Sequence, residues 1–67
     1  MDKFAERLKE LRRDKNLSCE QLAKAINVTK TSIIRWENSK ADIKREYLIE
    51  LARFFNVSID YLVGIER

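Results

Sequence analysis

The stretch LAKAINVTKTSIIRWEN, residues 22–38, has the pattern of two helices with only Asn27 and Val28 between them. Asn is, after Gly, the residue that best tolerates the left-handed backbone conformation that ends many helices, and Thr29 is a favourable N-cap for the next helix. Val28 precedes that cap and Ile33 lies four helical positions inside, a spacing at which two apolar side chains pack across a helix start. A connection this short forces a sharp turn and leaves no room for two helices lying side by side as a hairpin.

The same joint of Asn, an apolar residue and a hydroxyl residue recurs at NLS (16–18) and NVS (56–58). In the first of these, Gln21 follows Ser18 by three residues and completes a capping box. Each Asn is therefore predicted to end one helix, and each hydroxyl residue to begin the next. With Gly64 as the last stop, the predicted helices lie near residues 2–15, 18–26, 29–38, 45–55 and 58–63.

Two of the predicted helices carry regular apolar faces. Residues 2–15 have apolar side chains at i, i+4 and i+7, and residues 45–55 have them at i, i+3, i+4 and i+7. No strand-like alternation of any length competes with these patterns. The sequence predicts an all-α fold, a compact five-helix bundle with a helix-turn-helix formed by 18–26 and 29–38. The apolar positions of the two faces are Phe4, Leu8, Leu11, Leu48, Leu51, Ala52 and Phe55.

Length and charge limit the kinds of protein that this chain can be. The 67 residues suffice for one small domain, 1–67, and a domain of this size buries about 60% of the surface that its unfolded chain exposes. A formal charge of +3, from 14 Lys and Arg against 11 Asp and Glu, permits binding to nucleic acid without proving it. The N-terminal segment has neither the apolar core of a signal peptide nor a membrane span, and a single Cys excludes an internal disulfide. We expect a cytoplasmic protein without membrane contact, in which the Asn-containing joints are not glycosylation acceptors.

The residues that most enzymes and metal sites use are missing. The chain has no His, one Gly, one Cys and no Ser beside a plausible base. The usual nucleophilic, phosphate-binding and metal-binding arrangements are therefore absent. The acidic residues are scattered among Lys and Arg, as on solvated helix faces. We expect no enzymatic activity, no cofactor and no metal ion.

Two long segments, RLKELRRDKNLSCEQLAKAINVTKTSIIRWENSK (7–40) and LIELARFFNVSIDYLVG (48–64), resemble the phage-repressor-like helix-turn-helix domains, also called Cro/C1-type or XRE-type. The resemblance covers nearly the whole chain and includes RWEN (35–38) and DYL (60–62). It implies a lambda-repressor-like bundle in which the second helix lies across the DNA backbone and the third enters the major groove. We expect a sequence-specific transcriptional regulator, and a repressor, that occupies operator half-sites in double-stranded DNA. The alternative is a protein-interaction module of the same fold, antitoxin-like or a coactivator adaptor.

The resemblance makes one face of the third helix the candidate base-reading surface. On a wheel of about 100° per residue, Ile33, Trp36 and Glu37 fall outside the sector of this face. An Arg fork fits guanine O6 and N7, a Lys reaches guanine or a phosphate, and a Thr offers a hydroxyl or a methyl group. The alternative is an ordinary solvated helix face. The face holds Lys30, Thr31, Ile34, Arg35 and Asn38, of which we expect Lys30, Thr31 and Arg35 to contact bases.

Ile34 has two interpretations, since the corresponding residue of the family is commonly polar. Either it contacts the methyl group of a thymine base, or it packs at the helix edge or in a dimer contact. Trp36 lies on the side of Ile33, so we expect it in the core rather than stacked on a base. We expect the same of Tyr61 and of the Phe residues.

Contacts to DNA phosphates are expected at the start of the second helix and after the third. The hydroxyl of Ser18 and the backbone amide of Cys19 lie at a helix N-terminus, where anions bind. The Cys19 thiol is either a redox-sensitive group beside DNA or a tolerated replacement for the Gln that the family often has there. The other candidates for phosphate contacts are Asn38, Lys40, Lys44 and Arg45.

The resemblance also implies one structural ion pair, and module size implies a dimer. Arg12 and Glu37 match family positions that form a largely buried pair; losing one partner costs about 3 to 5 kcal/mol in a buried site and under about 1 kcal/mol in an exposed one. Because a single module buries only about 600 to 1,000 Å² on DNA, we expect a homodimer, at least on DNA. Ile59 and Ile65 are candidates for the contact between subunits, unless the core takes them.

Overall fold

The computed structural model of the chain describes residues 3–38 and 42–65. These residues form no strand and five helices: α1 (Phe4–Asp14), α2 (Cys19–Ala25), α3 (Lys30–Glu37), α4 (Arg45–Phe55) and α5 (Ile59–Val63). The helix ends differ from the predicted ones by at most two residues, mostly because the prediction counted cap residues as helical. These are the N-caps Ser18, Thr29 and Ser58 and the C-caps Lys15, Ile26 and Asn38. The all-α, five-helix prediction is confirmed. Within the described ranges, none of the helices has the length and hydrophobicity of a membrane span.

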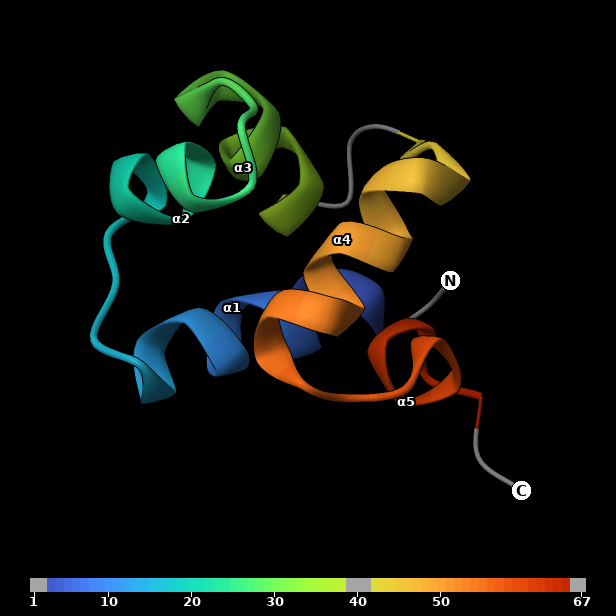
Figure 1. Cartoon of the computed structure of the whole chain (residues 1–67). Coiled ribbons are helices and arrows are strands. Elements are labelled where there is room, and N and C mark those ends of the chain that lie inside the picture. The colour runs from blue at the N-terminus through green and yellow to red at the C-terminus, as the bar shows by residue number, and fades with distance from the viewer. Residues whose placement is uncertain (1–2, 39–41, 66–67) are drawn as a thin grey trace.

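The helices are arranged around α1. Figure 1 shows α2 and α3 together at the upper end of the bundle, α4 crossing in front of α1, and α5 beside the end of α4. The element contacts agree with this view, since α3 packs on α2 and α1 while α5 packs on α1 and α4. α1 is thus the common support of two helices that lie far apart in the sequence.

The three Asn-containing joints have the same backbone geometry. The asparagines have left-handed φ angles of 56°, 59° and 56° at Asn16, Asn27 and Asn56. In all three, the amide of the next residue donates to the carbonyl five residues before it, at N···O distances of 3.1, 2.9 and 3.0 Å. These are bonds of a Schellman motif, which closes a helix by occupying carbonyls that the last turn leaves free. The chain uses the same closure at Gly64, where φ is 85°.

The hydroxyl residue of each joint caps the helix that follows. Ser18, Thr29 and Ser58 each accept a hydrogen bond from the amide three residues on, at 3.0, 3.1 and 3.0 Å. The Ser18 amide also donates to Gln21 Oε1 at 2.8 Å, which completes the predicted capping box. The predicted stops and starts are therefore confirmed, and they fix where α3 begins.

The core gathers side chains from all five helices. Each helix contributes one large side chain that is fully buried: Leu8, Leu22, Ile33, Leu51 and Leu62. Ile43, in the segment before α4, is buried as well. The apolar residues of the joints pack against this core, namely Leu17, Val28 and Val57. Each turn is thereby tied to the interior as well as closed by its own hydrogen bonds.

The aromatic residues of the bundle lie mostly inside it. Trp36 is 6% exposed, as predicted, and its ring centroid lies 5.6 Å from that of Tyr47. Phe4 and Phe55 are buried, and Phe54 is half-buried against the core. Core packing, rather than stacking on bases, is the role of Trp36 in this structure.

The prediction for Tyr61 is wrong. Its side chain is 41% exposed, because Leu62 takes the core position of α5 and adjacent residues of a helix point about 100° apart. The Arg7 guanidinium lies 4.3 Å from the centroid of the Tyr61 ring. Ile59 and Ile65 are also exposed, at 36% and 52%, so the core does not take them.

Candidate nucleic-acid interface

α3 turns one face to the core and the other to solvent. Ile33, Trp36 and Glu37 are its buried residues, and the helical wheel places all three outside the candidate face, with Glu37 at its edge beside Lys30. The residues predicted for the candidate face are all exposed: Lys30, Thr31, Ile34, Arg35 and Asn38. The structure therefore brings the three residues expected to contact bases, together with Ile34 and Asn38, onto one accessible surface.

Two hydroxyl groups fix the first turn of α3. Thr29 Oγ1 accepts from the Ser32 amide and lies 3.0 Å from Ser32 Oγ. Ser32 is half-buried, so it supports the helix start rather than adding to the exposed face. This role of Ser32 was not predicted from the sequence. The sequence does indicate it, because Ser32 is a polar residue three positions after the Thr29 cap, as Gln21 is three positions after the Ser18 cap in the α2 capping box.

The exposed face of α3 carries positive charge alone. Lys30 and Arg35 are its charged residues, and the first turn contains no acidic residue. The acidic residue of the helix, Glu37, is only 8% exposed. An anion that approaches this face therefore meets two cations and no exposed carboxylate of the same helix.

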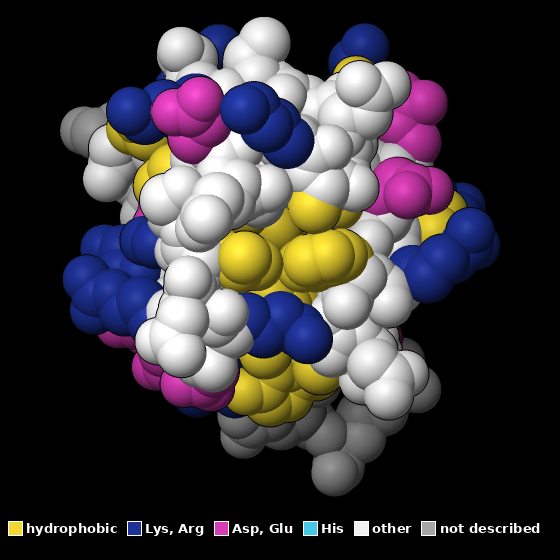
Figure 2. Space-filling view, turned by 60° about the vertical axis from the view of Figure 1, so that its left-hand side comes forward, with side chains coloured by type: hydrophobic (Ala, Val, Ile, Leu, Met, Phe, Trp, Pro, Cys, Tyr) yellow, Lys and Arg dark blue, Asp and Glu magenta, His cyan; other side chains and the backbone are white. Residues whose placement is uncertain are grey.

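The surface formed by α2 and the α1–α2 connection has a different distribution of charge from the exposed face of α3. Figure 2 shows apolar side chains near its centre, with Lys and Arg around them and Asp and Glu toward the edges. On α2, Glu20 and Lys24 form an exposed pair with an N···O distance of 3.7 Å. Charges of both signs leave no strong field of one sign here.

Glu37 is held by a bidentate ion pair with Arg12 of α1. Arg12 Nε donates to Glu37 Oε2 at 2.6 Å, and Nη2 donates to Oε1 at 3.0 Å. Only 15% of the Arg12 side chain and 6% of the Glu37 side chain are exposed. The hydrogen bond to Glu37 raises the pKa of Arg12 above its ordinary value. The pair that the resemblance implied is present, and it joins the last turn of α3 to α1.

Arg12 makes a further hydrogen bond that was not predicted from the sequence. Its Nη1 donates to the carbonyl oxygen of Leu17 at 2.8 Å. Leu17 is the apolar residue of the joint before α2, so one guanidinium connects α1, this joint and α3. Every residue has a backbone carbonyl, so the sequence does not show which carbonyl will accept this hydrogen bond.

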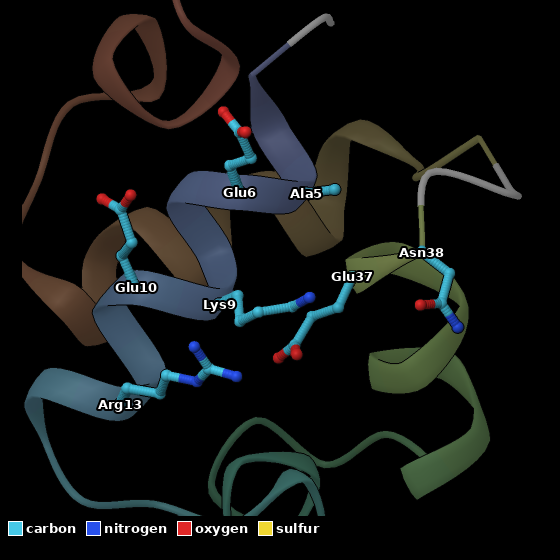
Figure 3. Close-up of a pocket in the computed structure, with 7 residues that line it drawn as sticks. All are labelled: Ala5, Glu6, Lys9, Glu10, Arg13, Glu37 and Asn38. Carbon is cyan, nitrogen blue, oxygen red and sulfur yellow. The ribbon is translucent and has the colours of Figure 1, made fainter.

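A hollow of about 420 Å³ lies beside the ion pair, between α1 and the end of α3. In Figure 3 the Lys9 and Arg13 side chains point toward the Glu37 carboxylate, whereas those of Glu6 and Glu10 point away from it. Groups of both signs therefore line the hollow. Among the described residues, no cluster of His, Cys, Asp and Glu could hold a metal ion. The arrangement surrounds Glu37 with cations and does not form a site for a ligand of one charge.

The residues predicted to contact phosphates lie at separate places. Ser18 is exposed, and while its oxygen accepts from the Gln21 amide, a hydroxyl also has a hydrogen to donate. Lys44 and Arg45 are exposed at the start of α4, where Lys44 is the N-cap residue. Asn38 is the C-cap of α3. Lys40 lies outside the described residues.

Cys19 is the first residue of α2. Its side chain is half-buried and packs against the hydrophobic core. A thiol that contacts apolar side chains favours the interpretation of Cys19 as a tolerated replacement over that of a sensor beside DNA. The group of Cys19 that remains a candidate for a phosphate is its backbone amide.

Residues 8–62 match the model of the helix-turn-helix family HTH_3. The chain belongs to this family. The match begins in α1 and ends in α5, so all five helices contribute to this helix-turn-helix domain. The predicted Cro/C1-type family is confirmed, as is the prediction that this domain is not an enzyme.

Two relatives resemble the helix-turn-helix domain in sequence. The HTH-type transcriptional activator BcrR of Enterococcus faecalis is 42% identical over 64 residues, covering 96% of this chain and 31% of the relative. YobD of Bacillus subtilis (strain 168), an uncharacterized HTH-type transcriptional regulator, is 36% identical over 62 residues, covering 92% of this chain and 55% of the relative. The chain thus spans about a third and about half of the length of these two proteins.

Two solved structures share the fold of the helix-turn-helix domain. A transcriptional regulator from Listeria innocua superposes with a TM-score of 0.87 at 34% identity, covering 96% of this chain and 60% of that one. The DNA-binding domain of the P22 C2 repressor superposes with a TM-score of 0.81 at 28% identity, covering 90% of this chain and 79% of that one. The repressor-like five-helix fold is therefore confirmed.

Proposed function

We propose that this helix-turn-helix domain binds double-stranded DNA sequence-specifically and regulates transcription by occupying operator half-sites. One observation carries the proposal: α3 exposes a cationic face without an exposed carboxylate while its opposite side is fixed in the core. An α-helix fits the major groove of B-DNA, which is about 12 Å wide. A helix held on one side by buried residues keeps its exposed side chains at fixed spacings opposite the base edges.

Base recognition is assigned to the exposed face of α3. Arg35 donates two hydrogen bonds to guanine O6 and N7, since the guanidinium fork matches these two acceptors. Lys30 donates to a guanine or to a phosphate near the start of the helix. Thr31 offers its hydroxyl or its methyl group. Each of these side chains is exposed and free to reach outward from the helix surface.

Phosphate contacts position the domain without reading the sequence. The Ser18 hydroxyl and the Cys19 amide serve this purpose at the start of α2, and Asn38 does so at the end of α3. Lys44 and Arg45 approach the backbone from the start of α4, and Lys40 belongs to the same proposed set. These contacts are sensitive to salt, because each neutralised phosphate releases counterions.

The proposed assembly is a homodimer on DNA in which residues 1–67 act as a single DNA-binding domain. One module of this size buries too little DNA surface for high specificity on its own, which favours two copies on a near-palindromic site. Ile59, Tyr61 and Ile65 supply exposed apolar surface in and after α5 for the contact between copies.

Repression in the cytoplasm is the regulatory action that we assign to the domain. Occupying an operator is sufficient to block transcription, whereas activation needs a further contact with the transcription machinery. The names of similar proteins include both an activator and a repressor, so the sign of regulation is tested directly with a reporter gene behind the selected operator.

Selection of binding sites from a pool of randomised duplexes tests the proposal. Wild-type protein is expected to enrich one half-site sequence, and Arg35→Ala to lose discrimination at one base pair, by about 1 to 3 kcal/mol. Uniform weakening over all sequences would make Arg35 a phosphate contact instead.

Binding without any sequence preference, with only a steep salt dependence, would reject the proposed function. That result would favour the other interpretation of the fold, a module whose main ligand is a protein.

A further inference from the structure

Ile34 is an exposed apolar residue on a polar helix face. Four large apolar side chains are exposed in the part of the chain that the structure describes, and three of them, Ile59, Tyr61 and Ile65, lie in or after α5. The fourth is Ile34, which leaves 41% of its surface to solvent on α3. Its neighbour Ile33 is fully buried, so the core already has the Ile that it uses from this turn.

The position of Ile34 is the middle of the candidate base-reading surface. Lys30 and Asn38 lie four residues before and after it, about 6 Å away along the helix axis in each direction. Across the face, Thr31 and Arg35 lie on one side of it. When α3 occupies a major groove, Ile34 is therefore enclosed by base edges on the DNA side.

The chemistry of the groove limits what an Ile can contact there. Base pairs present hydrogen-bond donors and acceptors in the major groove, and the apolar group among them is the C5-methyl of thymine. An Ile placed over a donor or acceptor displaces its water without replacing the hydrogen bond. An Ile placed over a thymine methyl group removes the apolar surface of both groups from water.

We infer that Ile34 reads the C5-methyl group of a thymine in each half-site, an inference that rests on the proposed function. Thr31, three residues before Ile34 on the same face, adds its own methyl group to this contact. Lys30 and Arg35 lie beside Ile34 and Thr31 and can donate hydrogen bonds to guanines next to the thymine. The half-site therefore contains a thymine adjacent to or one step from a guanine.

The charges around Ile34 favour DNA over a second copy of the chain. Lys30 and Arg35 both lie within about one turn of it, and the face has no exposed acidic residue. Two copies joined through Ile34 would bring these cations together, whereas phosphates on both sides of a groove balance them. The exposed side chains of α5 are a separate surface and are not required for this contact.

Replacing single thymines by deoxyuridine isolates the methyl group, because the two bases differ in nothing else. The selected operator is synthesised with each thymine replaced in turn, and dissociation constants are measured for wild type and for Ile34→Ala at one salt concentration. Deoxyuridine at one position is expected to weaken wild-type binding about fourfold, the value of one buried methyl-sized group. Ile34→Ala should lose most of this difference, and the methyl group of Thr31 should keep the remainder. It should also stay folded, because Ile34 is exposed and Ala favours helices.

Ile59→Ala is the matched control, since it truncates an exposed Ile outside α3. It should keep the full difference between thymine and deoxyuridine, whatever its effect on affinity. The inference is overturned if wild type tolerates deoxyuridine everywhere, if Ile34→Ala keeps the same sensitivity, or if Ile34→Ala reduces self-association instead. These results leave specific DNA binding intact, whereas selection without any enriched sequence removes the proposed function as well.

Discussion

The helices α3 and α5 begin in the same way and are held in the bundle in different ways. NVT (27–29) and NVS (56–58) place an Asn at φ of 59° and 56°, and the cap hydrogen bonds measure 3.1 and 3.0 Å. Both helices also rest on α1 (Figure 1). Local sequence therefore gives the two helices equivalent starts on a common support.

Their attachments beyond the first turn differ in polarity and burial. The last turn of α3 buries Trp36 and Glu37, and Glu37 is bonded twice to a largely shielded Arg12. The buried residue of α5 is Leu62, and Arg7 of α1 contacts α5 at the surface, through a hydrogen bond to the Tyr61 carbonyl and over the exposed Tyr61 ring. The helix with the candidate function is the one fixed by buried charged hydrogen bonds, whose geometry permits little rotation of α3 on α1.

Removing the carboxylate of Glu37 should give the largest effect of the substitutions considered. Glu37→Ala leaves the guanidinium of Arg12 mostly shielded from water without its partner, so we expect a loss of about 3 kcal/mol in the free energy of unfolding. Urea denaturation followed by circular dichroism measures it. Glu20→Ala, which breaks the exposed pair with Lys24, is the control and should change stability by under about 0.5 kcal/mol. Equal losses in both variants would show that water screens the Arg12–Glu37 pair.

The two joints should respond equally to loss of their asparagines. Ala in a left-handed conformation is strained, so Asn27→Ala and Asn56→Ala are each expected to cost about 1 kcal/mol of stability. Gly at either position should cost nothing or stabilise slightly, because Gly adopts positive φ without strain. Thermal unfolding of the four variants provides the comparison. A clear difference between the Ala variants would mean that tertiary packing contributes to one of the joints.

The aromatic ring on α5 should matter less than the ion pair on α3. Tyr61→Leu removes the ring from the Arg7 guanidinium but keeps the bond from Arg7 Nη1 to the Tyr61 carbonyl, which measures 2.6 Å. We expect a loss of under about 1 kcal/mol by urea denaturation, as for other exposed cation–π contacts. Tyr61→Phe retains the ring and should equal wild type. A loss from Tyr61→Leu as large as that from Glu37→Ala would remove the contrast between the two helices.

The smallest expected effect is that of pH on the ion pair. The hydrogen bond to Glu37 raises the pKa of Arg12, so the stability linked to Arg12 is complete below its unfolded-state pKa, which lies far above neutrality, and is lost only above that value. The difference in unfolding free energy between wild type and Glu37→Ala should therefore be constant from about pH 7 to about pH 10. Denaturation at several pH values in this interval measures it. A steady decline would show that another group titrates together with the pair.

Local signals made most of the fold predictable. The joints, the caps and the apolar faces each depend on residues within one or two turns, and the predicted helix ends were correct to within two residues. The exposed face of α3 followed from helical periodicity, since Ile33 and Trp36 mark its buried side. The pairing of Arg12 with Glu37 came from the family resemblance, because nothing in the two residues themselves connects positions 25 apart.

Other features depended on atoms that only folding brings together. Tyr61 was expected inside because it is aromatic, yet the one core position of the short helix α5 belongs to Leu62. The bond from Arg12 to the Leu17 carbonyl depends on where a turn places a backbone oxygen.

The sequence by itself determined where each helix begins and ends, because left-handed asparagines and capping hydroxyls act on the backbone within a few residues. The tertiary structure decided which side chains stay at the surface and how α3 is fixed. Burial depends on the packing of all five helices at once, and Arg12 unites three segments that are separated in the sequence. Ile34 shows both levels, since periodicity placed it on the outer face of α3 and the completed core left it there.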